Sequence, residues 1–293
     1  MSVSLYSDPD DLIRIIRESS SKLDPIPTGE KPRPPSKAFT HLVFDIYGTL
    51  MVSGVGDIGN SAPADRGSAL MKVLVDAGAP SPPPAKILEA KFLEAIEDHQ
   101  ESTRAKGVEY PEVEIREVWQ SFIEETVKGF FPSPKAIEEI ALRFELEVNP
   151  VWPMPGLVST LKSLRDYFPA FGVVSNAQFF TPLLFSALTG ESLEDLGFDE
   201  NLCVWSFEER EAKPSPHLFS LLLERIGADV NEADCLYVGN DMLNDISAAS
   251  HIGLQTALFA GDQRSLRLRE THPFCEILSP DSVLTTLEQL IPT

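Results

Sequence analysis

A regular alternation of short apolar runs and helical segments after residue 150 constrains the fold most strongly. The apolar runs cover residues 171–174, 202–205, 235–238 and 256–259, and helical patterns lie near residues 157–167, 216–226 and 244–252. Strands that are apolar throughout are typical of a parallel sheet covered by helices on both faces. The sequence therefore predicts an α/β fold with a doubly wound parallel sheet, which the apolar run at residues 41–44 extends by one strand.

Between about residues 61 and 148 the sequence changes to helical periodicity with no strand pattern. Val118, Trp119 and Phe122 repeat at helical spacing, and Ser133-Pro134 is a typical helix start. We expect residues 57–149 to form an all-helical domain inserted into the α/β core, which takes residues 38–56 and 150–293. Five polar residues of this insert are candidates to face a substrate: Arg66, His99, Arg104, Lys106 and Arg116.

The first 37 residues precede the predicted sheet. Asp8 and Pro9 are typical of the start of a helix, and residues 24–37 carry five prolines. Such a proline-rich stretch favours a stiff linker or an arm that lies on the body of the protein. We therefore predict that residues 1–37 are an N-terminal helix and a proline-rich arm, a tether without chemistry.

Charge and composition exclude several classes of partner. The chain has 45 acidic and 24 basic residues, a formal net charge of −21, which argues against nucleic acid or an anionic membrane as a partner. No apolar run is long enough to span a membrane, and the first residues lack the pattern of a signal peptide. The three cysteines form no zinc or disulfide pattern. We expect a cytoplasmic protein, a monomer or a homodimer.

Polar residues follow three of the predicted strands directly. Asp45 follows the first, Ser175-Asn176 the second along the chain, and Asn240-Asp241 comes just after the strand at 235–238. Ligands of open α/β sheets bind beyond the carboxyl ends of the strands. Each residue alone is typical of a cap or a turn, but together they predict a site at one edge of the sheet.

In chain order, these motifs resemble the pattern of the haloacid dehalogenase superfamily. They are Asp45-x-x-Gly-Thr49, a strand followed by Ser175-Asn176, Lys213-Pro, and Gly-x-Asp241-x-x-x-Asp245. The resemblance covers roughly residues 41–262. It implies a Rossmann-like core, a helical cap formed by the insert, and a hydrolase that attacks its substrate with an aspartate.

The resemblance also implies roles for individual residues. Asp45, Ser175 and Lys213 would be catalytic, and Thr49, Ser175 and Asn176 would bind the substrate. Mg²⁺ takes hard oxygen ligands, which Asp45, the carbonyl of Tyr47 and Asp241 would supply, with Asp245 supporting them. Asn240 could take the metal position in place of Asp241, although the spacing of the two carboxylates favours Asp241. The expected reaction is Mg²⁺-dependent hydrolysis of a small phosphorylated metabolite through a phosphoaspartate on Asp45.

One position departs from the phosphatase pattern. Most phosphatases of this superfamily have a second aspartate as general acid and base where this chain has Tyr47, and a phenol is a poor base at neutral pH. Tyrosine resembles the metal-free 2-haloacid dehalogenases, but their later tyrosine is Phe219 here. Dehalogenation of a small halogenated metabolite therefore stays an alternative. So does a catalytically impaired phosphate-binding or interaction protein.

Overall fold

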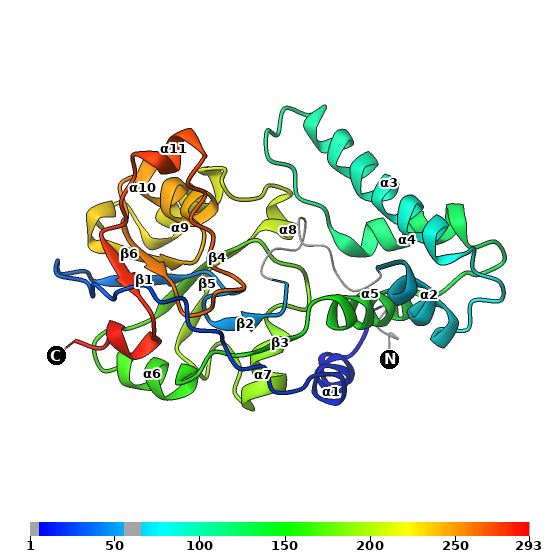
Figure 1. Cartoon of the computed structure of the whole chain (residues 1–293), viewed down its shortest axis with the longest axis horizontal. Helices are drawn as coiled ribbons and strands as arrows, with labels where there is room; N and C mark the ends of the chain where they lie inside the picture. Colours follow the sequence, from blue (N-terminus) through cyan, green and yellow to red (C-terminus); the bar gives the residue numbers. More distant parts are fainter. Residues whose placement is uncertain (1–5, 56–65, 293) are drawn as a thin grey trace.

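A computed structural model of the chain describes residues 6–55 and 66–292. Its core is a six-stranded parallel sheet in the order β5-β4-β1-β6-β7-β8 (Figure 1). The strands are β1 (His41–Phe44), β4 (Phe171–Ser175), β5 (Phe198–Trp205), β6 (Cys235–Gly239), β7 (Gln255–Phe259) and β8 (Ser282–Leu284). The predicted doubly wound α/β fold is thus confirmed.

Helices cover both faces of this sheet because alternate side chains of each strand point to opposite sides. In β1, Leu42 and Phe44 are buried in one cluster, and Val43 is buried in another. The first cluster includes residues of α6 (Leu157–Leu164) and α7 (Leu183–Thr189), the second residues of α9 (His217–Ile226) and α10 (Ala248–His251). The shorter helices are α8 (Ser206–Glu209), α11 (Pro273–Glu276), η1 (Glu232–Asp234), η2 (Met242–Ser247) and η3 (Leu287–Leu290).

Four helices lie to one side of the sheet and share a separate hydrophobic core. They are α2 (Arg66–Asp76), α3 (Ala85–Arg104), α4 (Ile115–Thr126) and α5 (Pro134–Val148). Trp119 is fully buried at their centre, with ring centroids 4.9 Å from Phe92 and 5.4 Å from Phe144. Residues 66–148 hold helices and no strand, as the periodicity predicts. The expected boundary between residues 56 and 57 lies outside the described residues.

Two short strands connect this helical unit to the sheet. β2 (Met51–Ser53) follows β1, and β3 (Val151–Pro153) follows α5. They pair antiparallel, with Val52 opposite Trp152. This two-stranded sheet was not predicted from the sequence, because each strand has only three residues. The sequence analysis also missed β8 and the early start of β5 at Phe198.

The N-terminal helix α1 (Pro9–Ser19) packs against both parts of the molecule (Figure 1). Asp11 pairs with Lys135 of α5 at 2.8 Å, and Arg17 donates to the carbonyl of Ala187 in α7 at 2.9 Å. The proline-rich arm runs back along the sheet, where Arg33 forms a bridge with Val283. Ile26 and Thr28 also bond to Asp262 and Ala260, so the arm lies on the body of the protein, which was one of the two predicted forms. In the described ranges, no helix has the length and apolarity needed to cross a membrane.

Candidate active site

The site lies where the three central strands end. β1 has β4 and β6 as its neighbours, so Asp45, Ser175 and Asn240 meet at one edge of the sheet. Two glycines allow the turns to close together here. Gly48 has φ +84°, and a Cβ on it would clash with the side chain of Asn240. A Cβ on Gly239 would lie 2.4 Å from Cγ of Asp245.

Asp45 is buried and is held through one carboxylate oxygen. Ser175 Oγ donates to Asp45 Oδ1 at 2.9 Å, and Lys213 Nζ donates to the same oxygen at 2.7 Å. The described residues donate no hydrogen bond to Oδ2, the second oxygen. The structure therefore brings together the three residues expected to be catalytic, with one carboxylate oxygen left for a reaction.

Lys213 is the charged centre of the site and is almost completely buried. Its ammonium also donates to Asp245 Oδ1 at 2.5 Å and to the hydroxyl of Tyr237 at 3.0 Å. Burial opposes the ammonium, but Asp245 and Asp45 outweigh it and keep the pKa of Lys213 above its ordinary value. Burial raises the pKa of Asp245, and the nearby charge of Asp45 raises it further. The ammonium of Lys213 offsets only part of this effect, because it is shared by the two carboxylates.

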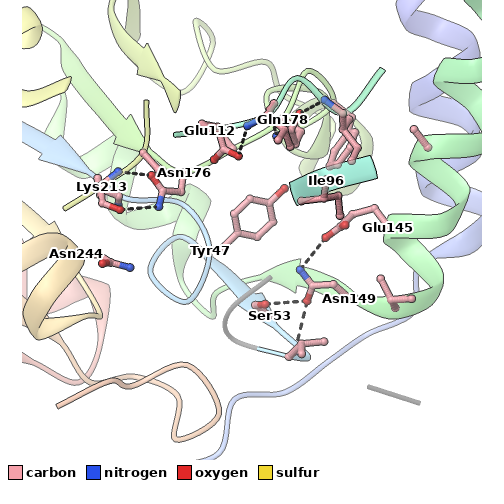
Figure 2. A pocket seen from close by; sticks show the side chains of 18 of the residues that line it. Tyr47, Ser53, Ile96, Glu112, Glu145, Asn149, Asn176, Gln178, Lys213 and Asn244 are labelled. Carbon is pink, nitrogen blue, oxygen red and sulfur yellow. Dashed lines mark hydrogen bonds between the residues drawn. The ribbon is translucent and has the colours of Figure 1, made fainter. Parts of the chain in front are cut away.

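The two other predicted substrate-binding residues make structural contacts. Asn176 accepts a hydrogen bond from the backbone N–H of Lys213 at 2.8 Å, which fixes the loop that carries the lysine (Figure 2). Thr49 is fully buried, and its hydroxyl donates to Asn240 Oδ1 at 3.1 Å. Asn176 also lines the cavity described below, whereas Thr49 supports it from behind.

Tyr47 lies at the centre of the site, and its hydroxyl is directed towards Ile96 of the helical unit (Figure 2). Its hydroxyl and that of Thr181 share a hydrogen bond of 3.0 Å. Burial, together with the charge of Glu145, raises the pKa of the phenol far above its ordinary value. The side chain therefore stays protonated and neutral, so it cannot act as the base that an aspartate would provide.

Asp241 is buried at the edge of the site and carries an ion pair that the sequence did not predict. Arg269 donates to both carboxylate oxygens, with Nη2 2.6 Å from Oδ2. Oδ1 also accepts the backbone N–H groups of Leu243 and Asn244, as a cap of η2. A bridge between Asp241 and Arg267 holds the loop that brings Arg269 to this place.

Oxygen atoms of the kind that Mg²⁺ prefers are nonetheless gathered here. Asp45 Oδ2 and the backbone carbonyl of Tyr47 accept no hydrogen bond from the described residues, and Asn240 and Asp241 line the same cavity. Asp45, Asp241 and Asp245 carry one more negative charge than Lys213 and Arg269 neutralise. Donor chemistry and charge therefore fit a divalent cation, for which Arg269 competes at Asp241. The described residues contain no cluster of three His, Cys, Asp or Glu that could hold a metal.

A cavity of about 480 Å³ opens above Asp45 and extends between the sheet and the helical unit. Two further carboxylates line it, Glu112 from the segment before α4 and Glu145 from α5. Burial raises the pKa of each to about 7. Glu112 accepts a hydrogen bond from Ser206, and Glu145 accepts one from Asn149 (Figure 2).

Of the five polar candidates in the insert, only Arg66 lines the cavity. Arg116 pairs instead with Glu114 and Glu138, and Arg104 pairs with Glu97 on the outer surface. Sequence reasoning missed Tyr237, Arg269 and the two cavity glutamates. A phenol inside an apolar strand needs a hydrogen-bond partner, which was an available signal for Tyr237. Arg269 lies in a loop without a recognisable pattern.

A buried aspartate at the end of the first strand, held by a serine and a lysine from neighbouring segments, defines a hydrolase site on a doubly wound sheet. The match to a family model agrees with this class. The chain belongs to the haloacid dehalogenase-like hydrolase family, whose model matches residues 39–253.

One curated relative within this family is a phosphatase. A ribulose-1,5-bisphosphate 5-phosphatase of Halopiger xanaduensis is 29% identical over 114 residues, which are 38% of this chain and 44% of that protein. The chain thus matches less than half of the length of this relative.

Solved structures of a dehalogenase and of a phosphatase share the fold. A 2-haloacid dehalogenase from Pseudomonas syringae pv. Tomato has a TM-score of 0.56 and 21% identity, covering 86% of this chain and 96% of that one. A phosphatase of the family from Thermococcus onnurineus has a TM-score of 0.51 and 18% identity, covering 86% and 95%. At such identities the likeness concerns the fold alone.

Proposed function

We propose that this hydrolase cleaves phosphomonoesters through a phosphoaspartate on Asp45. The observation that carries the proposal is the hydrogen bonding of the Asp45 carboxylate. Ser175 and Lys213 both donate to Oδ1, whereas Oδ2 accepts no hydrogen bond from the described residues. The buried ammonium of Lys213, 2.7 Å from this carboxylate, gives it a fixed direction. The phosphatase among the relatives supports the same choice of substrate class.

In this reaction, an oxygen of Asp45 forms a bond to phosphorus while the bond from phosphorus to the leaving oxygen breaks. The leaving oxygen takes up one proton. Water then attacks the phosphoaspartate, gives up a proton, and releases inorganic phosphate with Asp45 restored. Lys213 and the Ser175 hydroxyl bind and orient the groups, and the cavity walls exclude bulk water.

The proposal includes Mg²⁺ as a cofactor, which Asp45, the carbonyl of Tyr47 and either Asp241 or Asn240 would hold. When bound, the ion would offset the negative charge of the phosphate next to three carboxylates. Asp241 joins this set only by giving up its pairing with Arg269.

The test is turnover of a panel of phosphomonoesters with Mg²⁺, with EDTA, and with the Asp45→Asn variant. The variant should lose at least about a thousandfold of kcat, because the nucleophile is gone. Phosphate release that persists unchanged in both EDTA and the variant would contradict the proposal.

A second candidate is metal-free hydrolysis of a 2-haloacid, favoured by the ion pair of Asp241 with Arg269. This pair balances Asp241 without any added cation. Chloride release from 2-chloropropionate in EDTA would support this candidate, and its absence at high enzyme concentration would remove it.

A further inference from the structure

We propose that the substrates of this site are aryl phosphomonoesters: a single phosphate on an uncharged, largely apolar aromatic body. The inference rests on the proposed phosphatase function and names its substrate class. Three features of the cavity lead to it: the lining beyond Asp45, the charges in that lining, and the residue that stands in place of a general acid.

The lining beyond Asp45 is mainly apolar. Its aromatic members come from both parts of the molecule, namely Tyr47, Phe92, Phe144 and Phe180, and the aliphatic members include Ile96 and Val113. The volume of about 480 Å³ is within the range of small-molecule pockets. An aromatic body gains both burial and ring contacts in such a place.

The charges in the lining exclude a second phosphate. Among the described residues that line the cavity, Lys213 and Arg66 are the cations. Lys213 is bound to Asp45 and Asp245, and Arg66 lies 3.9 Å from Glu89. A second phosphate would instead face the carboxylates of Glu112 and Glu145, and like charges repel strongly where water is scarce. A sugar bisphosphate requires further cations for its second phosphate, which the described part of this lining does not supply.

The residue in place of the general acid limits the leaving group. The Tyr47 hydroxyl shares a hydrogen bond with Thr181 and is directed towards Ile96 of the helical unit (Figure 2), so it is not placed to protonate a leaving oxygen at Asp45. A phenol, with a pKa near ~10, leaves as an anion far more readily than an aliphatic alcohol, which is about as weak an acid as water. A site without this proton donor therefore favours aryl over alkyl esters.

The experiment compares kcat/KM for three probes at pH 8 with Mg²⁺: 2-naphthyl phosphate, cyclohexyl phosphate and fructose 1,6-bisphosphate. We expect the naphthyl ester to exceed each of the others by at least about tenfold, since loss of a positioned acid alone costs more than this for a poor leaving group. Equal or faster hydrolysis of the bisphosphate or the cyclohexyl ester would overturn the inference and leave the phosphatase function standing. Hydrolysis of none of the three would contradict the phosphatase function itself.

Glu145→Gln tests the role of charge in the lining, separately from the effect of the leaving group. Glu145→Gln should lower the preference for naphthyl phosphate over the bisphosphate by a factor of about 3–10. Glu147→Gln is the matched control, because Glu147 lies on the same helix but pairs with Lys72 on the surface. It should keep the wild-type ratio, and an equal ratio in both variants would overturn the charge argument.

Tyr47→Asp places a carboxyl group at the position of the missing acid. It should reduce the preference for naphthyl over cyclohexyl phosphate, whereas Tyr47→Phe should retain it. A Tyr47→Phe variant that shifts this ratio as much as Tyr47→Asp would overturn the leaving-group argument.

Discussion

Replacing Lys213 with methionine removes the only ammonium between two buried carboxylates of the described site. The side chain of Lys213 is 3% exposed, that of Asp245 is 2% exposed and that of Asp45 is 8% exposed. Breaking a buried ion pair by removing one partner costs about 3–5 kcal/mol, because the remaining charge is left without compensation. For a chain of this size, we expect the Tm to fall by about 6–10 °C at pH 8.

The size of this loss should depend on pH. Asp245 already has a pKa of about 6 in the folded protein, against 3.8 as its ordinary value, and loss of the ammonium raises it further. A carboxyl group whose pKa is raised by folding destabilises the fold above that pKa, and the cost disappears as pH falls towards the ordinary value. Below about pH 6, Asp245 is protonated in the folded state of both proteins, so the difference in Tm between wild type and variant should be widest at pH 8 and narrow as pH falls to about 6.

Differential scanning calorimetry at pH 8, 6 and 4 measures both effects. Lys162→Met is the matched control, because Lys162 is 52% exposed and pairs with Glu191 on the surface. Such a pair contributes at most about 1 kcal/mol. A Lys213→Met variant that loses no more stability than Lys162→Met, or whose loss is the same at all three pH values, would refute the reasoning.

Three further predictions concern the surroundings of the site. Arg269→Gln removes the ion pair of Asp241, so Mg²⁺ should bind about tenfold more tightly. Isothermal titration calorimetry without substrate measures this affinity, and an unchanged value would show that Asp241 is not a ligand. Ile16→Ala, at a fully buried position of α1, should lower the free energy of unfolding by about 2–5 kcal/mol, measured by urea titration. Ile26 is 45% exposed, so the control Ile26→Ala should change this free energy by less than about 0.5 kcal/mol. Similar losses in both variants would mean that α1 does not pack firmly on the body. Burial raises the pKa of Glu145 from 4.5 to about 7, so ionisation of this carboxyl costs stability as pH rises through this range. Glu145→Gln should remove about 2–3 kcal/mol of the decline in stability between pH 5 and pH 8, measured from Tm at both pH values. An unchanged slope would contradict the burial of this carboxyl.

The positions of most site residues along the sheet were predictable from the sequence. Asp45 and Ser175 end apolar strands, and parallel strands place all their carboxyl ends at one edge. The chemistry of the proposed reaction also follows from the residue types. The two-stranded sheet of β2 and β3, with three residues in each strand, was too short to leave a pattern.

Local sequence could not reveal which charges compensate one another. Arg269 meets Asp241 only because the loop at Arg267 pairs beside it, and Tyr237 reaches Lys213 only because β6 lies next to β1. Glu112 and Glu145 read as surface acids in the sequence, yet the packing of the helical unit over the sheet encloses them. Likewise, α1 binds to α5 and α7, which are more than a hundred residues away.

The sequence alone thus determined the type of sheet and the edge at which reactive groups gather, because strand periodicity and strand ends are local properties. The tertiary structure decided the order of the strands, the enclosure of the cavity and the partners of each buried charge. These depend on contacts between segments far apart in the chain, whose free energy no local pattern records.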